Sequence, residues 1–314
     1  MPDPKLRFRF REPTVDTNLP ISDGTVKVEG FDLEVMHVGE EDRFEADARD
    51  EGFGTLLQRK VQDAPDVCIP AFPNRKFRLS YIYVNAAAGI DSPKDLEGKR
   101  VGIPVWGNTA GVWARGALQN YYEVDLTAVR WLSARPGAGS TAAGIEIGTL
   151  SGGLNDMLVQ GALDAVIDPN VLPSITERDP RVRRLFPDYK AEEQRYFRET
   201  GIFPISHAVT LRREFVERYP EAPVALLEAF RKARDLAFYR IQGPDPQYMV
   251  MSWASAAVDE QRALMGDDYW PYNVDRNRRS LEALTLFAHQ QGLTPYRVDY
   301  ESFFSPEAAA LSGA

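Results

Sequence analysis

The sequence predicts an α/β protein of two lobes, joined by two crossing strands, with a ligand cleft between the lobes. Short strands alternate with helices along the chain, a pattern typical of α/β layers with parallel sheets. The length of 314 residues favours two domains. One crossing strand is expected near residues 81–85 and the returning one near 207–211. We therefore expect a discontinuous first lobe (1–84 and 208–314) and a second lobe (85–207).

The first part of the chain contains runs of apolar, aromatic and β-branched residues that predict strands. The Asp23-Gly24 pair marks a turn between the first two of these runs. Gly52 and Gly54 interrupt the helical segment that follows. In chain order we expect strands at 6–10 and 27–38, a mostly helical segment at 41–60, an apolar segment at 67–71 and a buried strand at 79–84.

Strands and helices continue to alternate through the rest of the chain. Ser92 as N-cap and Pro93 at the first helical position predict a short helix. The Gly- and Ala-rich connection at 135–148 lacks the Gly-Lys-Ser/Thr ending of a phosphate loop and is expected to be a flexible loop with no nucleotide role. The other expected elements are strands at 101–105, 129–132, 162–167 and 202–211, and helices at 110–122, 153–161, 214–240, in part of 182–201, and at 246–291 with a break at 270–272.

Composition excludes several classes of protein. A formal net charge of −9 without a basic stripe argues against nucleic-acid binding. No segment approaches the roughly 20 apolar residues of a membrane span, and residues 1–14 contain no apolar signal segment. A single cysteine, Cys68, rules out an internal disulfide and favours a reducing, cytoplasmic setting. His37, His207 and His289 lie far apart, so the spacing predicts no metal site.

A basic loop stands before the first crossing strand. Arg75, Lys76 and Arg78 surround Phe77, and Pro73 indicates that the loop is rigid. Cations on a rigid loop beside a buried strand suit an anionic small molecule. The alternative is a solvated charge cluster on an ordinary loop.

A second feature suited to anions is the start of the helix expected at 110–122, which follows the strand expected at 101–105. The first backbone N–H groups of a helix have no partner inside it, so we expect Asn108 and Thr109 to lie at a binding site for negative charge. Trp106 is expected either to stack on an aromatic ring or to fill the interior of the lobe. Arg115, two turns into the helix, either reaches the cleft or forms an ion pair between helices.

Six segments carry a resemblance to a known family. They are FPNRKFRLSYIYVN at 72–85, DLEGKRVGIP at 95–104, TAGVWARG at 109–116, RRLFPD at 183–188, TGIFPISH at 200–207 and WPYNVDRNR at 270–278. In this order the chain resembles the 4,5-dihydroxyphthalate decarboxylase family over roughly residues 25–305. That family has the type II periplasmic-binding-protein-like fold of solute receptors but works in the cytoplasm. The resemblance therefore implies this fold and a cytoplasmic enzyme.

The chain departs from the family pattern at several positions. Leu79 stands where members usually have a histidine, which leaves the identity of the proton donor open. Residues 47–51 (DARDE) stand where Asp-Val-Ser-Glu is usual, and residues 168–170 (DPN) where an arginine is common. The resemblance thus leaves the particular aromatic acid undefined.

Decarboxylating an electron-rich arene requires a carboxylate anchor, a base for the ring hydroxyl and an acid for the ring carbon. Arg75 and Arg78 suit bidentate carboxylate binding. Judged from its sequence neighbours alone, His207 is more typical of a histidine buried in the core. The resemblance instead implies that His207 acts as a general acid or base. Asp50 or Glu51 is expected to orient it or to accept the hydroxyl proton.

The resemblance implies a cofactor-independent decarboxylase of a hydroxylated, phthalate-like aromatic carboxylate held in the cleft. Two alternatives stay open: a non-catalytic binding protein for an anionic solute, and another lyase of the same fold that acts on a carboxylated aromatic. The expected partner is the small-molecule substrate, with no nucleic acid and no membrane. An oligomer is compatible with the sequence, although no pattern defines one.

Overall fold

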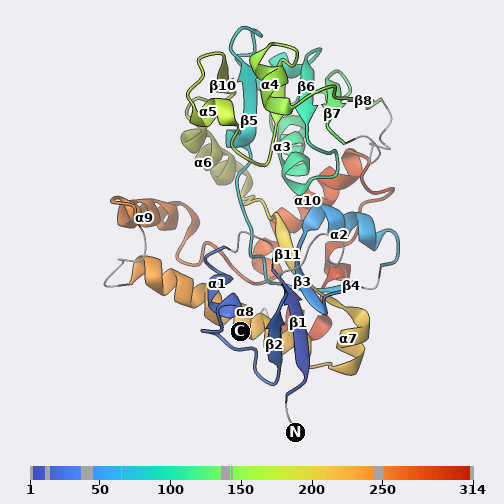
Figure 1. Ribbon diagram of the computed structural model, residues 1–314, viewed down its shortest axis with the longest axis vertical. Helices are drawn as coiled ribbons and strands as arrows, with labels where there is room; N and C mark the ends of the chain where they lie inside the picture. Colours follow the sequence, from blue (N-terminus) through green and yellow to red (C-terminus); the bar gives the residue numbers. More distant parts are fainter. Residues whose placement is uncertain are drawn as a thin grey trace.

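The structure, a computed structural model, describes residues 3–10, 15–36, 45–64, 66–135, 142, 144–243 and 250–311. It contains two α/β lobes, one above the other in Figure 1, each built on its own sheet. This confirms the predicted bilobal α/β fold. The residue bounds of the two lobes stay a prediction.

The first lobe is built on a sheet of β1 (Lys5–Arg9), β2 (Asp32–Val35), β3 (Ala48–Gly52), β4 (Asp66–Ile69) and β11 (His207–Arg212). Their order across the sheet is β2-β1-β3-β11-β4. β1 is parallel to β2 and β3, whereas β11 is antiparallel to β3 and β4. The strand that returns from the second lobe is therefore inserted between two early strands, which brings residues 207–212 next to residues 48–52.

The second lobe is built on a sheet of β5 (Ile82–Asn85), β6 (Arg100–Ile103), β7 (Arg130–Ser133), β8 (Ile147–Thr149), β9 (Ala165–Ile167) and β10 (Val182–Arg184). Their order is β10-β5-β9-β6-β7-β8. β6 is parallel to β7 and β9, and β5 is antiparallel to β9 and β10. All four residues of β5 are buried, as expected for a strand covered on both faces.

Helices surround both sheets. Those of at least one full α-turn are α1 (Leu19–Ser22), α2 (Phe53–Lys60), α3 (Thr109–Asn120), α4 (Leu154–Val159), α5 (Pro173–Thr176), α6 (Tyr189–Thr200), α7 (Arg213–Arg218), α8 (Ala222–Gln242), α9 (Ala254–Met265), α10 (Arg278–Gln290) and α11 (Pro306–Ala310). Short 3₁₀ turns are η2 (Leu79–Tyr81), η3 (Pro93–Leu96), η4 (Asp275–Asn277) and η5 (Tyr300–Phe303). Within the described ranges, no helix is long and apolar enough to cross a membrane.

The lobes meet where α3 of the second lobe packs on α10 (Figure 1). The Trp113 and Phe287 rings meet edge to face, with centroids 5.7 Å apart. Gly116 makes this approach possible, because a Cβ at that position would lie 2.0 Å from the Phe287 ring. The contact holds the N-terminus of α3 above the sheet of the first lobe, where the Gly54 N–H donates to Thr109 Oγ1 at 2.9 Å.

The helix expected at 41–60 is wrong in its first half. Residues 41–44 lie outside the described part of the chain, residues 48–52 form strand β3, and α2 begins only at Phe53. Charged side chains are poor strand formers, so local propensity argued against a strand here. In the structure β3 pairs with β1 and with β11, and this tertiary pairing prevails.

Three other segments also differ from expectation. The strand expected at 27–38 spans only Asp32–Val35, because Gly30 at φ +77° turns the chain before it. The strand expected at 79–84 begins with a 3₁₀ turn, and extended pairing starts at Ile82. Within the connection at 135–148, residues 136–141 and 143 lie outside the described residues, and its end contributes to edge strand β8.

Candidate active site

A buried histidine–carboxylate pair lies at the junction of β3 and β11. His207 is opposite Gly52 and Val209 is opposite Asp50 in the antiparallel ladder, so the His207 and Asp50 side chains share one face of the sheet. Asp50 Oδ1 lies 2.6 Å from His207 Nδ1, and the two side chains are only 4% and 5% exposed. A carboxylate at Nδ1 orients the ring and leaves Nε2 as the nitrogen directed elsewhere.

Gly52 lies close to both His207 Nε2 and the start of α3. A Cβ added to Gly52 would lie 4.0 Å from His207 Nε2 and 3.4 Å from Thr109 Oγ1. The imidazole, the Gly52 backbone of β3 and the start of α3 therefore lie near one another.

Glu51, the second carboxylate expected beside the histidine, lies on the opposite face of β3. Because side chains alternate along a strand, Asp50 and Glu51 point in opposite directions. Glu51 Oε2 lies 3.4 Å from Arg49 Nε, and Arg49 also pairs with Asp66 at 2.8 Å. The structure brings Asp50, but not Glu51, to His207.

Arg75 is a buried cation beside this pair. Residues 74–76 run along residues 204–207, with the Asn74 carbonyl accepting from the His207 N–H at 3.1 Å. The guanidinium lies 4.4 Å from the centroid of the Phe203 ring, and Nη2 donates to the Phe203 carbonyl at 2.8 Å. Among the described residues, Nε and Nη1 have no hydrogen-bond partner. Burial lowers the pKa of Arg75 to about 9.

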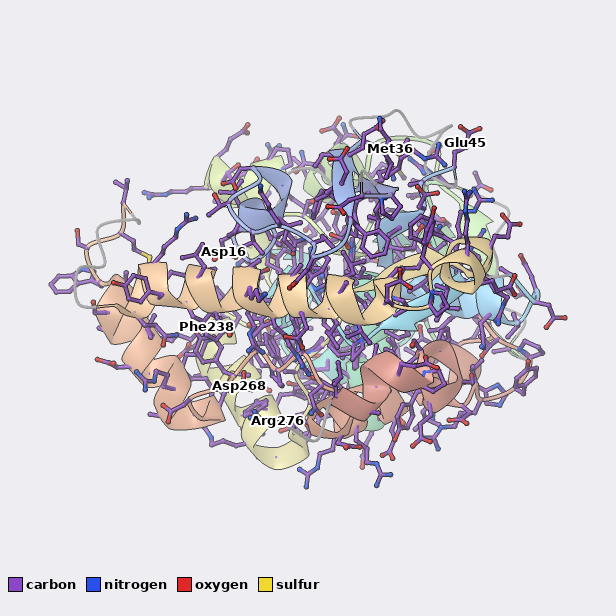
Figure 2. All side chains as sticks on the ribbon, turned by 90° about the horizontal axis from the view of Figure 1, so that it is seen from below. Asp16, Met36, Glu45, Phe238, Asp268 and Arg276 are labelled. Atoms are coloured by element: carbon purple, nitrogen blue, oxygen red, sulfur yellow. The ribbon has the colours of Figure 1, made fainter. Side chains whose placement is uncertain are left out.

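Arg75 also lacks a dedicated carboxylate partner within the described ranges. Asp268 is close enough to raise its pKa slightly, but that carboxylate is bound by Arg276 and lies 3.6 Å from Arg234 (Figure 2). A buried cation without its own anion is costly unless a ligand supplies one.

Arg78 is bound to Ser206, the residue that precedes His207. Its Nη2 donates to Ser206 Oγ at 2.6 Å, and its guanidinium lies 5.5 Å from the Tyr81 ring centroid. Arg78 is 8% exposed. The two arginines expected to anchor carboxylates thus both flank residues 203–207, the segment that leads into β11.

At the start of α3, backbone N–H groups of the first turn already donate hydrogen bonds to a side chain of the protein. Asn108 is the N-cap, and its Oδ1 accepts from Ala110 N at 2.9 Å and Gly111 N at 3.4 Å. Two of the amides expected to face an anion therefore already have an acceptor. A substrate-binding role for Asn108 and Thr109 stays a prediction.

Trp106 and Arg115 form a separate buried contact at the end of α10. Arg115 is fully buried and donates to Gln291 Oε1 at 2.8 Å and to the Trp106 carbonyl at 2.5 Å. Its guanidinium lies 3.8 Å from the Trp106 ring centroid, and Trp106 Nε1 donates to the Gln291 carbonyl. These contacts join the lobes and do not involve His207. A role for either residue in substrate binding stays a prediction.

Sequence reasoning missed a pair of buried hydroxyls, those of Thr17 and Tyr272. Tyr272 is 1% exposed, and its hydroxyl lies next to that of Thr17. Burial is the main cause that raises the pKa of Tyr272, with a smaller effect of the same sign from Asp50. The Trp-Pro-Tyr motif was visible in the sequence, but no local pattern brings its tyrosine near enough to Asp50 for that carboxylate to affect its pKa.

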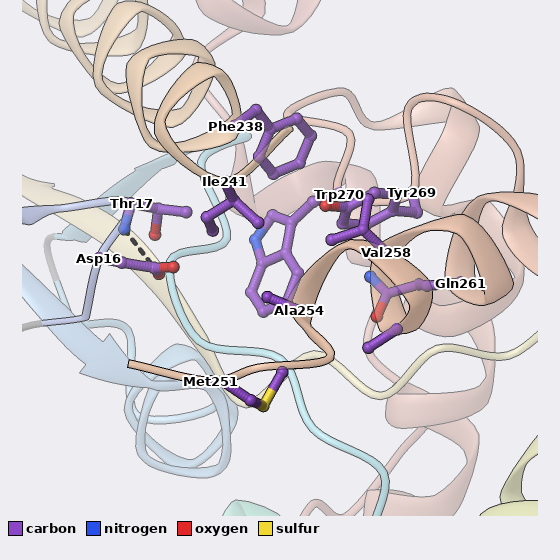
Figure 3. Close-up of a pocket in the computed structure, with 11 residues that line it drawn as sticks. Asp16, Thr17, Phe238, Ile241, Met251, Ala254, Val258, Gln261, Tyr269 and Trp270 are labelled. Carbon is purple, nitrogen blue, oxygen red and sulfur yellow. Dashed lines mark hydrogen bonds between the residues drawn. The ribbon is translucent and has the colours of Figure 1, made fainter. Parts of the chain in front are cut away.

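A pocket of about 210 Å³ opens next to these hydroxyls, between α8, α9 and residues 269–270. Figure 3 shows Thr17 and Asp16 on one side of it and Trp270 facing them. Within the described residues, no group of three or more His, Cys, Asp or Glu side chains could hold a metal ion. His37 lies outside those residues.

Solved structures with the same architecture define the class of this protein. SsuA, the periplasmic aliphatic sulphonate binding protein of Escherichia coli, is 15% identical with a TM-score of 0.56 and covers 98% of this chain and 99% of its own. The desulfurization enzyme DSZB is also 15% identical, with a TM-score of 0.58 and 98% of each chain covered. At such identities the likeness shows the fold alone: a bilobal protein of the type II periplasmic-binding-protein-like class.

Sequence relatives place the chain more closely. No family model matches it. A 4,5-dihydroxyphthalate decarboxylase from Comamonas testosteroni is 28% identical over 323 residues, which cover 96% of this chain and 97% of that protein. One from Pseudomonas putida is 31% identical over 203 residues, which cover 57% of this chain and 76% of that protein. The chain belongs to the 4,5-dihydroxyphthalate decarboxylase family, a family of carboxy-lyases, and the resemblance read from its motifs is confirmed.

Proposed function

We propose that this protein removes CO₂ from a hydroxylated, phthalate-like aromatic carboxylate bound between its lobes. The observation that carries the proposal is the buried Asp50–His207 pair, with 2.6 Å between Oδ1 and Nδ1, flanked by Arg75 and Arg78. Family membership supports the reaction class, since both relatives are named as decarboxylases of 4,5-dihydroxyphthalate.

The two arginines supply the carboxylate anchors in this proposal. A carboxylate has two oxygens that each accept hydrogen bonds, and the Arg75 guanidinium keeps two donor nitrogens, Nε and Nη1, without a partner among the described residues. Arg78, bound to the serine that precedes the histidine, supplies a second cation on the segment that leads into β11. Together they orient the substrate so that one carboxyl-bearing ring carbon faces His207.

His207 transfers the proton. With Asp50 at Nδ1, the imidazolium donates the proton on Nε2 to the ring carbon that carries the departing carboxylate. The bond from that carbon to the carboxylate carbon then breaks, and its electron pair restores the aromatic ring as CO₂ leaves. The net change is one proton gained and one CO₂ lost, without an oxidant or a reductant. Asp50 stabilises the imidazolium and holds the ring in place.

Cofactor independence follows from the substrate's own chemistry. A hydroxyl para to the reacting carbon donates electron density and stabilises the positive charge that protonation creates. The ring itself thus serves as the electron reservoir that a decarboxylase otherwise obtains from a cofactor. A cytoplasmic location, expected from the sequence, is part of the same proposal.

The shared fold favours one alternative, capture of an anionic solute without chemistry. SsuA, by its name, binds aliphatic sulphonates on the same architecture. In that case the buried arginines would bind a carboxylate, and His207 would only add a hydrogen bond. Capture predicts binding without release of CO₂, whereas the proposed activity predicts both.

The test is CO₂ release from 4,5-dihydroxyphthalate and related hydroxyphthalates. We expect His207→Ala to lower kcat by about 10²- to 10⁴-fold, the usual contribution of a general acid, while ligand affinity changes little. His289→Ala is the matched control, because His289 lies on α10 and its Nδ1 contacts the Thr294 carbonyl at 3.1 Å. It should retain the wild-type kcat.

Three outcomes would contradict the proposal. Tight binding of every hydroxyphthalate without turnover would favour capture. An equal loss of kcat in both histidine variants would remove His207 from the mechanism. Loss of turnover on chelation, restored by a divalent metal, would overturn cofactor independence.

A further inference from the structure

The proposed anchor Arg78 occupies an unusual place, the N-cap position of a helical turn. It directly precedes η2, and its carbonyl accepts from the Tyr81 N–H at 3.2 Å. N-cap residues are usually Ser, Thr, Asp or Asn, because their side-chain oxygens accept from the free N–H groups of the first turn. A guanidinium carries donors only and cannot do this. The turn therefore needs an acceptor from another part of the chain.

Glu193 of α6 supplies that acceptor. α6 packs against η2 (Figure 1), and Glu193 Oε1 accepts from the Ser80 N–H at 2.8 Å. Ser80 is the second residue of η2 and is buried. Glu193 thus replaces the N-cap side chain that Arg78 does not provide. The Arg78 guanidinium is left to donate to Ser206 Oγ at 2.6 Å.

The carbonyl of Ser80 is bound as well. Arg184 of β10 donates to it from Nη1, and the Arg184 guanidinium lies 5.4 Å from the Tyr83 ring centroid and 4.8 Å from that of Tyr189. Two oppositely charged side chains, from two different elements, therefore bind the N–H and the C=O of one residue. Because Ser80 lies two residues after Arg78, these bonds fix the chain just before it enters β5.

The position of Glu193 carries a cost that this contact offsets. Burial is the main cause that raises the pKa of Glu193. The hydrogen bond from Ser80 and the nearby positive charges of Arg184 and Arg78 act in the opposite direction. A carboxylate that loses hydration is destabilising unless such bonds compensate for it. The hydrogen bond to η2 is therefore the interaction that favours a glutamate here.

We propose that Glu193 is a positioning residue, which fixes η2 through Ser80 and so holds the Arg78 guanidinium where it binds a substrate carboxylate. The role of Arg78 as an anchor rests on the proposed function. A long side chain that is ordered before the ligand arrives loses less conformational entropy on binding. Without Glu193 the turn loses its capping acceptor, and the guanidinium is no longer held in one place. Glu193 therefore contributes to carboxylate affinity through Arg78.

The experiment is a double-mutant cycle of Arg78 and Glu193, measured by isothermal titration calorimetry with phthalate. Phthalate carries both carboxylates, whereas 3,4-dihydroxybenzoate, the expected product from 4,5-dihydroxyphthalate, retains one. It has no hydroxyl, so the proposed chemistry does not decarboxylate it. We expect Arg78→Met to weaken phthalate binding by at least about tenfold and Glu193→Leu by about five- to tenfold. In a protein that already carries Arg78→Met, Glu193→Leu should have no further effect, because no guanidinium remains to be positioned.

Three controls separate positioning from a general loss of structure. Glu193→Gln keeps a side-chain oxygen as acceptor and should bind phthalate like the wild type. Glu199→Leu is the matched control, since Glu199 is an exposed glutamate of the same helix that accepts from the Tyr121 hydroxyl, and it should leave the affinity unchanged. Catechol, which has two hydroxyls and no carboxylate, should bind every variant as it binds the wild type.

Each result decides the inference separately from the activity. An equal loss from Glu193→Leu with and without Arg78 would overturn it, because Glu193 would then act independently of the anchor. It would also be overturned if Glu193→Gln bound phthalate as weakly as Glu193→Leu, if catechol binding fell in parallel, or if the wild type did not bind phthalate. If the cycle shows the expected coupling but no hydroxyphthalate releases CO₂, the positioning role stands and the proposed decarboxylation fails.

Discussion

Arg75 and Arg115 are two buried arginines with similar surroundings and different partners. Each guanidinium lies over an aromatic ring, at 4.4 Å from the Phe203 centroid and 3.8 Å from the Trp106 centroid. Burial lowers the pKa of both to about 9. Arg115 donates to the Gln291 side chain and to the Trp106 carbonyl, whereas Arg75 donates only to the Phe203 carbonyl within the described residues.

The comparison shows that burial and a lowered pKa do not by themselves mark a binding site. Both arginines have these properties, yet Arg115 joins α3 to the residue after α10, and Arg75 keeps two nitrogens for which the described residues offer no acceptor. The two differ in degree: among the described residues Arg115 leaves only Nη1 without a hydrogen-bond partner and makes two hydrogen bonds, whereas Arg75 leaves both Nε and Nη1 and makes one. We therefore propose that Arg115 acts mainly in stability and Arg75 mainly in binding.

The largest expected effect is on stability, from Arg115→Met. Removing this side chain leaves the Gln291 amide oxygen and the Trp106 carbonyl without their donor in a buried contact. We expect the free energy of unfolding to fall by about 3 kcal/mol, measured by urea denaturation. Arg198→Met is the control, since Arg198 is exposed on α6 and should change stability by less than about 0.5 kcal/mol.

A loss of stability no larger than that of the Arg198 control would contradict this assignment. It would mean that the Arg115 contacts contribute little net free energy. A large loss of ligand affinity in a fully folded Arg115 variant would instead restore the substrate-binding role expected from the sequence.

Arg75→Met tests whether Arg75, unlike Arg115, acts in ligand binding. We expect it to weaken binding of 3,4-dihydroxybenzoate by about 2–3 kcal/mol, because the bound carboxylate loses its charge-assisted hydrogen bonds. The free energy of unfolding should hold or rise, since a buried cation with no ion pair in the described structure is replaced by an apolar side chain of similar length. Calorimetry measures the first quantity and urea denaturation the second.

Lys76→Met is the matched control for Arg75. Lys76 is the neighbouring cation, is exposed, and contacts the Tyr81 ring at 5.0 Å. Its removal should leave binding nearly unchanged. If the two variants weaken binding equally, general positive charge rather than a specific anchor attracts the ligand.

Local sequence signals predicted those elements for which the capping residues and the hydrophobic pattern indicate the same structure. Ser92 and Pro93 begin η3 with a reciprocal capping box, and α3 starts at Thr109, within one residue of expectation. Strand β3 could not be predicted in this way. Its charged residues have low strand propensity, and the pairing with β11 that stabilises it joins segments far apart in the sequence.

The candidate site shows the same division. His207 and the two arginines proposed as anchors were singled out from residue type and motif. The choice between Asp50 and Glu51 needed the strand, because only its alternation sends one carboxylate to His207 and the other to Arg49. The sequence predicts Tyr272 only as part of a helix break, since nothing local to residues 270–272 encodes the electrostatic influence of Asp50 on its hydroxyl.

The smallest expected effect on the free energy of unfolding comes from the ion pair of a third arginine, Arg100. Arg100 receives its carboxylate from the protein: its Nη2 lies 2.7 Å from Asp164 Oδ1, with the arginine side chain 43% exposed. The hydrogen bonds from Arg100 are the main cause that holds the pKa of Asp164 below its usual range. After allowance for solvent screening, we expect Asp164→Asn to cost about 0.5–1 kcal/mol of unfolding free energy at pH 7.

The pH dependence of this cost has a defined sign. Because the pKa of Asp164 is lower in the folded state, the stabilisation is fully present above the unfolded pKa of about 3.9 and is lost as pH falls through the folded value. The stability difference between wild type and Asp164→Asn should therefore shrink below about pH 4, as urea denaturation at several pH values would show. A double-mutant cycle with Arg100→Met isolates the pair. A difference that persists unchanged into acid would mean that packing, and not the ion pair, produces it, and Arg100 would then resemble Arg115 more than its exposure suggests.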